Sequence, residues 1–289
     1  MKTKLMGILN VTPDSFYDGG KYPTAGLAAA RARELAAEGA DIIDIGGESS
    51  RPNSEPVSAR QELARVLPVL KLLAKSGIKV SLDTYKPEVA KAGLELGVSM
   101  INDITGLANH KMRALVAAAG CKCVIMHMKG MPRTMQHAPK YKDVAKEVAD
   151  FFKERIALCE SSGIARKNLI LDPGIGFGKL PEHNLLLLQA IPQFRKLGPV
   201  LIGASRKSFM GKLFGAEQRC SVPDFAQLRK SPKARMDVSD KGDGAEGGDR
   251  LYTSLAVACY CYSQGVDWLR VHDVKESRLA LKAMEMLSK

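Results

Sequence analysis

Asp41-Ile-Ile-Asp-Ile-Gly-Gly47 is a nearly continuous apolar run that leads, after a polar loop, into a helix-like stretch at Ser58–Lys75. Runs of this kind are typical of parallel strands that are buried on both faces. The same unit, an apolar run followed by a polar tip and a helical stretch, recurs along the chain. The other runs are Lys4–Asn10, Lys79–Thr84, Ser99–Ile104, Lys122–Met128, Asn168–Gly174, Pro199–Ser205 and Asp267–Asp273.

Helix-like stretches alternate with these runs, and many of them end at a glycine, which is a common helix stop. The stretches are Thr24–Glu38, Ser58–Lys75, Lys86–Leu96, Asn109–Ala118, Lys142–Ser162, Glu182–Lys196, Leu251–Ser263 and Lys275–Leu287. Eight alternating units predict one α/β domain over residues 1–289, a (β/α)8 TIM barrel. An open doubly wound sheet is the alternative. A glycine-rich turn after the first strand would favour it, but Asn10-Val-Thr-Pro-Asp14 follows there.

One segment interrupts the alternation. Residues 214–249 are polar and rich in Gly, Asp, Lys and Pro, with almost nothing to bury. We predict a mobile insertion between the seventh strand and the seventh main helix. It follows a group of candidate site residues, so we consider both a neutral insertion and one that alters access to the site.

The composition limits the classes of partner. Hydrophobic residues make up 45% of the chain, which allows a large core, and no apolar stretch is long enough to span a bilayer. The N-terminus lacks the cleavage site of a secretory signal, so we expect a cytoplasmic protein. The net charge is +12, but the basic residues are spread along the chain without a nucleic-acid motif. We therefore expect anionic small substrates and no nucleic-acid or membrane partner.

The cysteines form two Cys-x-Cys pairs, with neither a Cys-x-x-Cys pair nor a zinc-ligand spacing. We interpret them as reduced thiols that pack as small hydrophobic side chains, in preference to metal ligands or redox groups. They are Cys121, Cys123, Cys159, Cys220, Cys259 and Cys261.

Nearly every predicted strand has a polar residue at its C-terminal tip, although the strand beneath it is apolar. In this fold the active site forms at those tips, so the pattern predicts many convergent polar groups. The tips in chain order are Asn10, Glu48, Asp83, Asn102, His127, Asp172, Ser205-Arg206-Lys207, and Arg270 with His272.

Asp83, Asn102 and Asp172 lie at the ends of the third, fourth and sixth predicted strands. Two carboxylates and an amide suit a flat heterocycle with adjacent N–H donors, such as a 2-amino-4-oxopyrimidine ring. A metal site is the competing interpretation. Ordinary strand ends and helix caps also use these residue types.

Basic and hydroxyl residues mark the last two tips. Arg270 and His272 lie two apart on one strand and suit a phosphate or diphosphate. Ser205-Arg-Lys-Ser208 opens a helical turn, which is a place where anions bind, although solvated basic side chains are equally common. We interpret His127 as a hydrogen-bonded structural residue in preference to a base.

Three glycine- or hydroxyl-rich loops complete the pattern. Asn10–Phe16 and Gly46–Pro52 are either simple turns or loops that close over a substrate. Gly174-Ile-Gly-Phe-Gly178 lacks the lysine and serine of a nucleotide-binding loop, so we expect Phe177 to pack near the heterocycle.

Together these segments resemble the dihydropteroate synthases, and the resemblance covers almost the whole chain. Each segment is short, but eight of them occur in the right order and each lies at a strand tip. They are Met6-Gly-Ile-Leu-Asn-Val-Thr-Pro-Asp-Ser-Phe16, Gly47-Glu-Ser-Ser-Arg-Pro52, Asp83-Thr84, Asn102-Asp-Ile104, Met126-His-Met128, Leu171-Asp-Pro-Gly174, Ser205-Arg-Lys-Ser208 and Arg270-Val-His-Asp273.

The resemblance implies a condensation of (7,8-dihydropterin-6-yl)methyl diphosphate with 4-aminobenzoate, giving 7,8-dihydropteroate and diphosphate. It also implies Mg²⁺ as cofactor, bound through Asn10, sensitivity to sulfonamides as a drug target, and a possible homodimer. The implied pterin-holding residues are Asp83, Asn102, Asp172 and Lys207, with Met126, Phe177 and Gly203 lining the pocket. Arg270 and His272 would bind the diphosphate, and Asp83 would also stabilise a developing methylene cation. Ser50 and Arg51 would close over the site, and Phe16, Pro52 and Ser208 would form the 4-aminobenzoate pocket.

Two features depart from the family. Ser50 stands where threonine is more usual, and the insertion at 214–249 replaces a short connection. Two rival functions remain, a pterin-dependent methyltransferase and a catalytically silent pterin-binding module. The first has no need of the diphosphate-binding segments, and the second would be expected to lose Asn10, Lys207 or Arg270.

Overall fold

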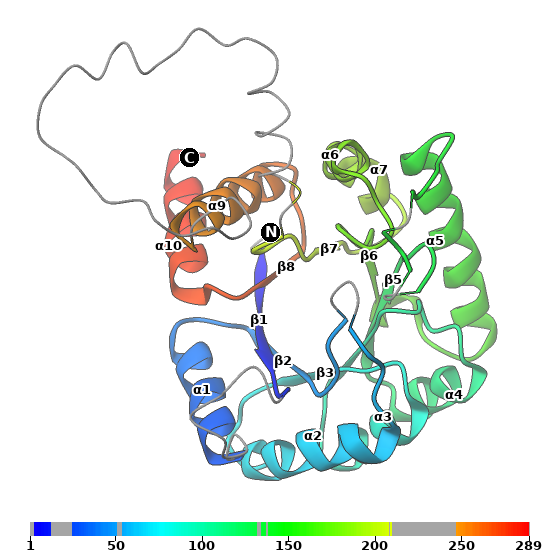
Figure 1. Cartoon of the computed structure of the whole chain (residues 1–289), viewed down its shortest axis with the longest axis vertical. Coiled ribbons are helices and arrows are strands. Elements are labelled where there is room, and N and C mark those ends of the chain that lie inside the picture. The colour runs from blue at the N-terminus through cyan, green and yellow to red at the C-terminus, as the bar shows by residue number, and fades with distance from the viewer. Residues whose placement is uncertain are drawn as a thin grey trace, which may run out of the picture.

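A computed structural model of the chain describes residues 3–12, 25–50, 54–131, 134–136, 138–207, 209 and 247–288. Parallel strands form one sheet that curls into a barrel, and helices surround it (Figure 1). The strands are β1 Lys4–Asn10, β2 Ile42–Gly46, β3 Val80–Asp83, β4 Met100–Asp103, β5 Lys122–Met126, β6 Leu169–Asp172, β7 Leu201–Ile202 and β8 Trp268–Val271.

The strand order is β6-β5-β4-β3-β2-β1-β8-β7, with every ladder parallel. The two ends of this order meet through one isolated bridge, Leu171 to Val200, and the Leu171 amide donates to the Pro199 carbonyl at 2.8 Å. The predicted TIM barrel is confirmed. The seventh strand is shorter than predicted, because only two of the residues 199–205 form a ladder with β8.

Helices follow the strands, with local signals that explain where they begin and end. Ser58 caps the second helix through a capping box with Gln61, and Gly120 ends the fourth in a left-handed conformation. The helices are α1 Ala25–Ala37, α2 Ala59–Leu73, α3 Pro87–Glu95, α4 His110–Ala119, α5 Val144–Ser161, α6 Pro181–Gln189, α7 Ile191–Arg195, α9 Gly247–Ser263 and α10 Val274–Leu287, with a 3-10 turn, η2, at Arg166–Asn168.

The sixth helical stretch is not the single helix predicted at Glu182–Lys196. It breaks at Ala190, and a new helix, α7, starts with Pro192 in its first turn. Proline has no amide hydrogen and clashes with a preceding helical turn, so it begins a helix more readily than it continues one.

The predicted insertion at 214–249 lies outside the described residues except at its end. Gly247 to Asp249 belong to the backbone of α9, so the helix begins before the predicted boundary. No helix among the described residues is both long and apolar enough to cross a membrane.

Alternate residues of the strands build two cores. Outward-facing side chains such as Ile43, Ile45 and Leu82 are fully buried and belong to the larger core between the strands and the helices. Inward-facing side chains fill the inside of the barrel as an apolar layer, as expected for this fold. That layer consists of Met6, Ile42, Met100, Val124, Ile170, Leu201 and Trp268.

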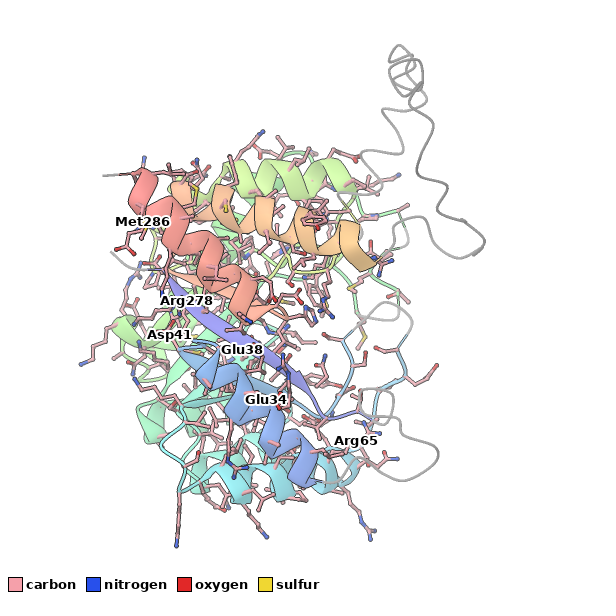
Figure 2. All side chains as sticks on the ribbon, turned by 90° about the vertical axis from the view of Figure 1, so that its left-hand side faces the viewer. Glu34, Glu38, Asp41, Arg65, Arg278 and Met286 are labelled. Carbon is pink, nitrogen blue, oxygen red and sulfur yellow. The ribbon has the colours of Figure 1, made fainter. Side chains whose placement is uncertain are left out.

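The N- and C-terminal parts of the chain are joined on the outside of the barrel. Arg278 of α10 donates from Nη2 to the Gly39 carbonyl and to Asp41 Oδ2, both at 2.6 Å (Figure 2). The five described cysteines are free thiols, and three of them, Cys123, Cys159 and Cys261, are buried as predicted. Cys220 lies outside the described residues.

Candidate active site

A polar layer lies directly above the apolar layer inside the barrel. Side chains on one face of a strand recur at every second residue, so each strand places its next inward side chain two positions further on. Counting two residues from the apolar layer, and taking β1 first, the positions are Ile8, Asp44, Asn102, Met126, Asp172, Gly203 and Arg270. Four of these seven side chains are polar. On β3, which has no residue in the apolar layer, Asp83 pairs with Asn102 and adds a fifth polar side chain to this layer.

Arg270 joins three strands at the centre of this layer. Its Nε donates to Asp44 Oδ2 at 2.6 Å, and its Nη2 donates to Asp83 Oδ2 at 2.7 Å. Asn102 donates from Nδ2 to the same Asp44 oxygen at 3.0 Å. Burial alone would lower the pKa of Arg270, but the carboxylates of Asp44 and Asp83 raise it above its ordinary value, so the guanidinium stays charged.

Acceptor atoms remain free in this network. Asp44 Oδ1 and Asn102 Oδ1 are buried and have no hydrogen-bond partner among the described residues. An unpaired buried acceptor is costly, which makes such atoms strong candidates for bonding a ligand with N–H donors. Burial also raises the pKa of the Asp83 carboxyl, against the opposing effect of Arg270.

Asp172 and Lys207 form the opposite side of the layer. Asp172 is buried at the tip of β6, and its Oδ1 accepts the Gly174 amide at 2.7 Å. The Lys207 ammonium donates to the Ile175 carbonyl and lies 4.5 Å from the centre of the Phe177 ring. Burial lowers the pKa of Lys207 to about 8, although the Asp172 carboxylate opposes the shift. Burial also raises the pKa of Asp172.

Asn10 and Asp83 both lie next to Gly46. A Cβ atom built on Gly46 would lie 3.7 Å from both Asn10 Oδ1 and Asp83 Oδ2, so the two side chains flank this glycine on the same side. Among the residues that the structure describes, no group of three or more His, Cys, Asp or Glu side chains could hold a metal ion. A hard oxygen from one amide still fits Mg²⁺ that is bound mainly by a diphosphate and water.

His272 and the turn after β7 lie at the rim. Ser205 Oγ is 3.1 Å from His272 Nδ1 and accepts the His272 amide at 3.2 Å, so this hydroxyl orients the imidazole. Arg206 adopts a left-handed conformation and pairs with Asp273. Gly203 lies next to Arg270, because a Cβ atom built on Gly203 would be in van der Waals contact with Arg270 Cβ at 3.7 Å.

His127 has the structural role that we preferred for it. Its Nδ1 is 3.0 Å from the ammonium of buried Lys179, which also donates to the carbonyls of His127 at 3.2 Å and Phe177 at 2.9 Å. Burial and the Lys179 charge lower the pKa of His127 to about 3, so the imidazole is neutral at pH 7. This cluster ties the tip of β5 to the loop that carries Phe177.

The structure thus brings together the predicted residues of strands β1, β3, β4, β6 and β8, together with Lys207. Ser50 is half-buried on the loop after β2. Four predicted residues, Phe16, Arg51, Pro52 and Ser208, lie outside the described residues.

Asp44 is the functional candidate that sequence reasoning missed. It lies inside an apolar strand and is fully buried, so the search for polar strand tips passed over it. The available signal was alternation, because a charged residue between outward-facing Ile43 and Ile45 has to point into the barrel.

The family model described as pterin binding enzyme matches residues 6–272. The chain therefore belongs to the pterin binding enzymes, a class that suits a barrel mouth lined by buried carboxylates and an amide. Within this family it groups with the dihydropteroate synthases. It is 42% identical over 283 residues to the dihydropteroate synthase of Escherichia coli (strain K12), covering 97% of this chain and 90% of that protein.

Two solved structures agree with this grouping. The Xanthomonas albilineans dihydropteroate synthase in complex with 7,8-dihydropteroate superposes with a TM-score of 0.80 at 37% identity, covering 99% of this chain and 94% of the other. The Yersinia pestis dihydropteroate synthase with a sulfonamide drug has a TM-score of 0.83 at 37% identity and the same coverage.

Proposed function

We propose that this chain condenses (7,8-dihydropterin-6-yl)methyl diphosphate with 4-aminobenzoate and releases diphosphate, as a step of folate biosynthesis. The observation that carries the proposal is the polar layer itself. It presents Asp83, Asn102 and Asp172 as acceptors, with Lys207 as a donor, directly above the apolar layer of the barrel. A pterin has a flat face and a row of N–H donors beside a carbonyl, so it matches both the shape and the hydrogen-bonding pattern.

The reaction breaks the bond between the pterin methylene carbon and a diphosphate oxygen, which leaves with the electron pair. It forms a bond from that carbon to the nitrogen of the aromatic amine, which then releases one proton to the solvent. Arg270 and His272 would stabilise the charge on the leaving diphosphate, and Asp83 would stabilise the methylene as it becomes positive. Arg270 already donates to Asp83, at 2.7 Å. A heterocycle that replaces Arg270 as the hydrogen-bond donor to Asp83 would therefore free the Nη2 group of Arg270 to bind the diphosphate.

Asn10 would hold Mg²⁺ through its amide oxygen at the tip of β1. The ion would supply positive charge against the diphosphate oxygens. The position of Asn10 Oδ1 at the tip of β1, next to Gly46 and on the same side of that residue as Asp83 Oδ2, supports this assignment.

Release of diphosphate from the purified chain tests the function. With Mg²⁺ and both substrates, release should depend on 4-aminobenzoate and should fall at least 100-fold in Lys207→Ala and in Arg270→Ala. Arg278→Ala is the matched control, since it removes an arginine that pairs with an aspartate outside the barrel mouth. Pterin binding without amine-dependent release would refute the condensation and favour a silent pterin-binding module. Methyl transfer to a corrinoid partner would favour the methyltransferase.

Three finer features belong to the same proposal. Sulfonamides, as mimics of 4-aminobenzoate, should compete with it. We expect the protein in the cytoplasm, which fractionation would test. We also propose a homodimer, supported by exposed apolar side chains on α9 and α10, of which Met286 is visible in Figure 2. They are Tyr252, Tyr260, Leu279, Met286 and Leu287. Sedimentation at micromolar concentration would reveal the dimer.

A further inference from the structure

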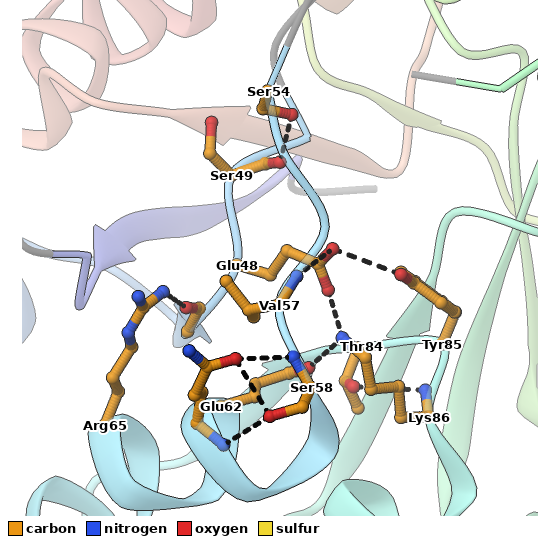
Figure 3. Close-up of polar contacts among 12 residues, drawn as sticks. Glu48, Ser49, Ser54, Val57, Ser58, Glu62, Arg65, Thr84, Tyr85 and Lys86 are labelled. Atoms are coloured by element: carbon orange, nitrogen blue, oxygen red, sulfur yellow. Dashed lines mark hydrogen bonds and ion pairs between the residues drawn. The ribbon is translucent and has the colours of Figure 1, made fainter. Parts of the chain in front are cut away.

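Glu48 is a strand-tip residue to which the proposed reaction assigns no role. It lies two residues beyond β2, on the loop 47–58 that joins β2 to α2, and its side chain is only 12% exposed. The carboxylate accepts from three groups (Figure 3). These are the Lys86 ammonium, the Tyr85 hydroxyl at 3.1 Å and the Val57 amide at 3.4 Å.

Lys86 connects Glu48 to a second carboxylate. Its ammonium also lies 2.5 Å from Glu62 Oε2, and Glu62 is fully buried in the first turn of α2. Burial alone would lower the pKa of Lys86, but hydrogen bonds to Glu48 and Glu62 raise it above its ordinary value. A pair of this kind differs from a surface salt bridge, because removing one partner leaves a charge in a site with little water.

The loop is attached at both of its described ends. At its start, Arg65 Nη1 donates to the Gly47 carbonyl at 2.6 Å, and a Cβ on Gly47 would lie 2.8 Å from Val66 Cγ1. At its end, the Val57 amide reaches back to Glu48. Glu48 therefore joins the two described ends of the loop, together with Ser54, whose hydroxyl donates to the Ser49 carbonyl at 2.6 Å.

The same contacts reach the site. Tyr85 and Lys86 lie two and three residues after Asp83 along the chain, and Asp83 pairs with Gly46 across the β2–β3 ladder. Glu48 thus joins the loop after β2 to the segment after β3. Asp83, a carboxylate of the polar layer, is the last residue of β3. Ser50 lies two residues after Glu48, on the same loop.

We propose that Glu48 is a positioning residue for the condensation, one that fixes residues 47–50, Ser50 among them, and residues 54–58 against the segment after β3. The kinetic part of this inference rests on the proposed function. A purely structural role would change the stability of the fold and leave turnover unaltered. The two roles therefore differ in what they predict for kcat.

Glu48→Gln is the sharpest variant. It keeps the shape and an acceptor for Tyr85 and Val57 but removes the charge that binds Lys86, and Lys86 keeps Glu62. We expect faster amide exchange in peptides of residues 47–58 without substrate. We also expect kcat to fall roughly 10- to 100-fold, while the dissociation constant of the pterin substrate stays within twofold of the wild-type value. Glu38→Gln is the matched control, because Glu38 is a partly buried partner of an arginine on α1.

Lys86→Arg provides a conservative second variant. It keeps a cation between the two carboxylates, so kcat should remain within about threefold of wild type and loop exchange should stay slow. Unchanged exchange in residues 47–58 of Glu48→Gln would overturn the proposal, and so would faster exchange with unchanged kcat. A wild-type chain without turnover would refute the proposed function instead, and the exchange measurement would still decide whether Glu48 fixes the loop.

Discussion

Replacing Asp44 with asparagine removes a buried charge at the centre of the polar layer without changing its shape. Asp44 Oδ2 accepts from Arg270 Nε at 2.6 Å and from Asn102 Nδ2 at 3.0 Å. An asparagine can keep its one oxygen in the place of Oδ2 and accept both bonds there, but as a neutral acceptor, while its amide nitrogen replaces the unpaired Oδ1. Arg270 would then be held mainly by Asp83, the carboxylate that we assign to the heterocycle.

The size of the effect follows from these two bonds. A hydrogen bond to a charged group contributes about 1.5–3 kcal/mol, and a neutral one about 0.5–1.5 kcal/mol. Weakening both bonds from a charged to a neutral acceptor costs roughly 2–3 kcal/mol, and relief of the buried charge offsets about 1 kcal/mol of it. The remaining 1–2 kcal/mol corresponds to a fall of roughly 5- to 30-fold in kcat/KM.

Initial rates of diphosphate release, measured beside thermal unfolding, test this reasoning. Asp41→Asn is the matched control, since Asp41 also pairs with an arginine at 2.6 Å, three residues earlier and away from the barrel mouth. Asp41→Asn should lower the melting temperature without altering kcat/KM by more than about twofold. If Asp44→Asn retained wild-type kcat/KM, Asp44 would have no part in holding Arg270 for the reaction.

Three further perturbations give distinct outcomes. The pKa of Lys207 is lowered to about 8, so its charge is present below that pH and lost above it. We therefore expect kcat/KM to fall above pH 8 in the wild type and only above about pH 10 in Lys207→Arg. A fall at the same pH in both proteins would exclude Lys207 as the titrating group. Gly174→Ala places a Cβ 2.0 Å from the His127 carbonyl oxygen at φ +66°, so urea unfolding should show a free energy of unfolding lower by about 3 kcal/mol or more. Gly120→Ala is the control, with an expected loss of about 1 kcal/mol, because φ is +60° there and nothing lies within 4 Å. Chelation should abolish turnover and Mg²⁺ should restore it, with roughly tenfold more Mg²⁺ needed by Asn10→Ala; turnover that persists in the chelator would contradict a metal at Asn10.

The barrel could be predicted from sequence because its strands are buried on both faces. Most strands are therefore apolar runs with a polar tip, as in Leu169–Asp172. Most of the polar layer followed from the same rule, since Asp83 and Asp172 end their strands and Asn102 is the second-last residue of its strand. The break at Ala190 was missed because the leucines of α6 continue the apolar pattern, while Pro192 alone carries the signal for a new helix.

Contacts between distant segments could not be predicted. The pairing of Arg270 with Asp44 joins residues 226 positions apart, and periodicity along one strand says nothing about which side chains meet across a barrel. Glu48 was identified as a polar tip, but its connection to Lys86 and Glu62 depends on how α2 and α3 pack beside β2 and β3.

The barrel closes between β6 and β7 through one bridge, whereas the other neighbouring strands are joined by two to five residue pairs. Mechanically it is a split ring. Asp172 stands at one end of the ring, and Lys207 follows the other end, five residues after Ile202. A flat ligand held by both residues would span the split from inside and supply cross-linking that the backbone does not, so the occupied ring would be stiffer than the empty one.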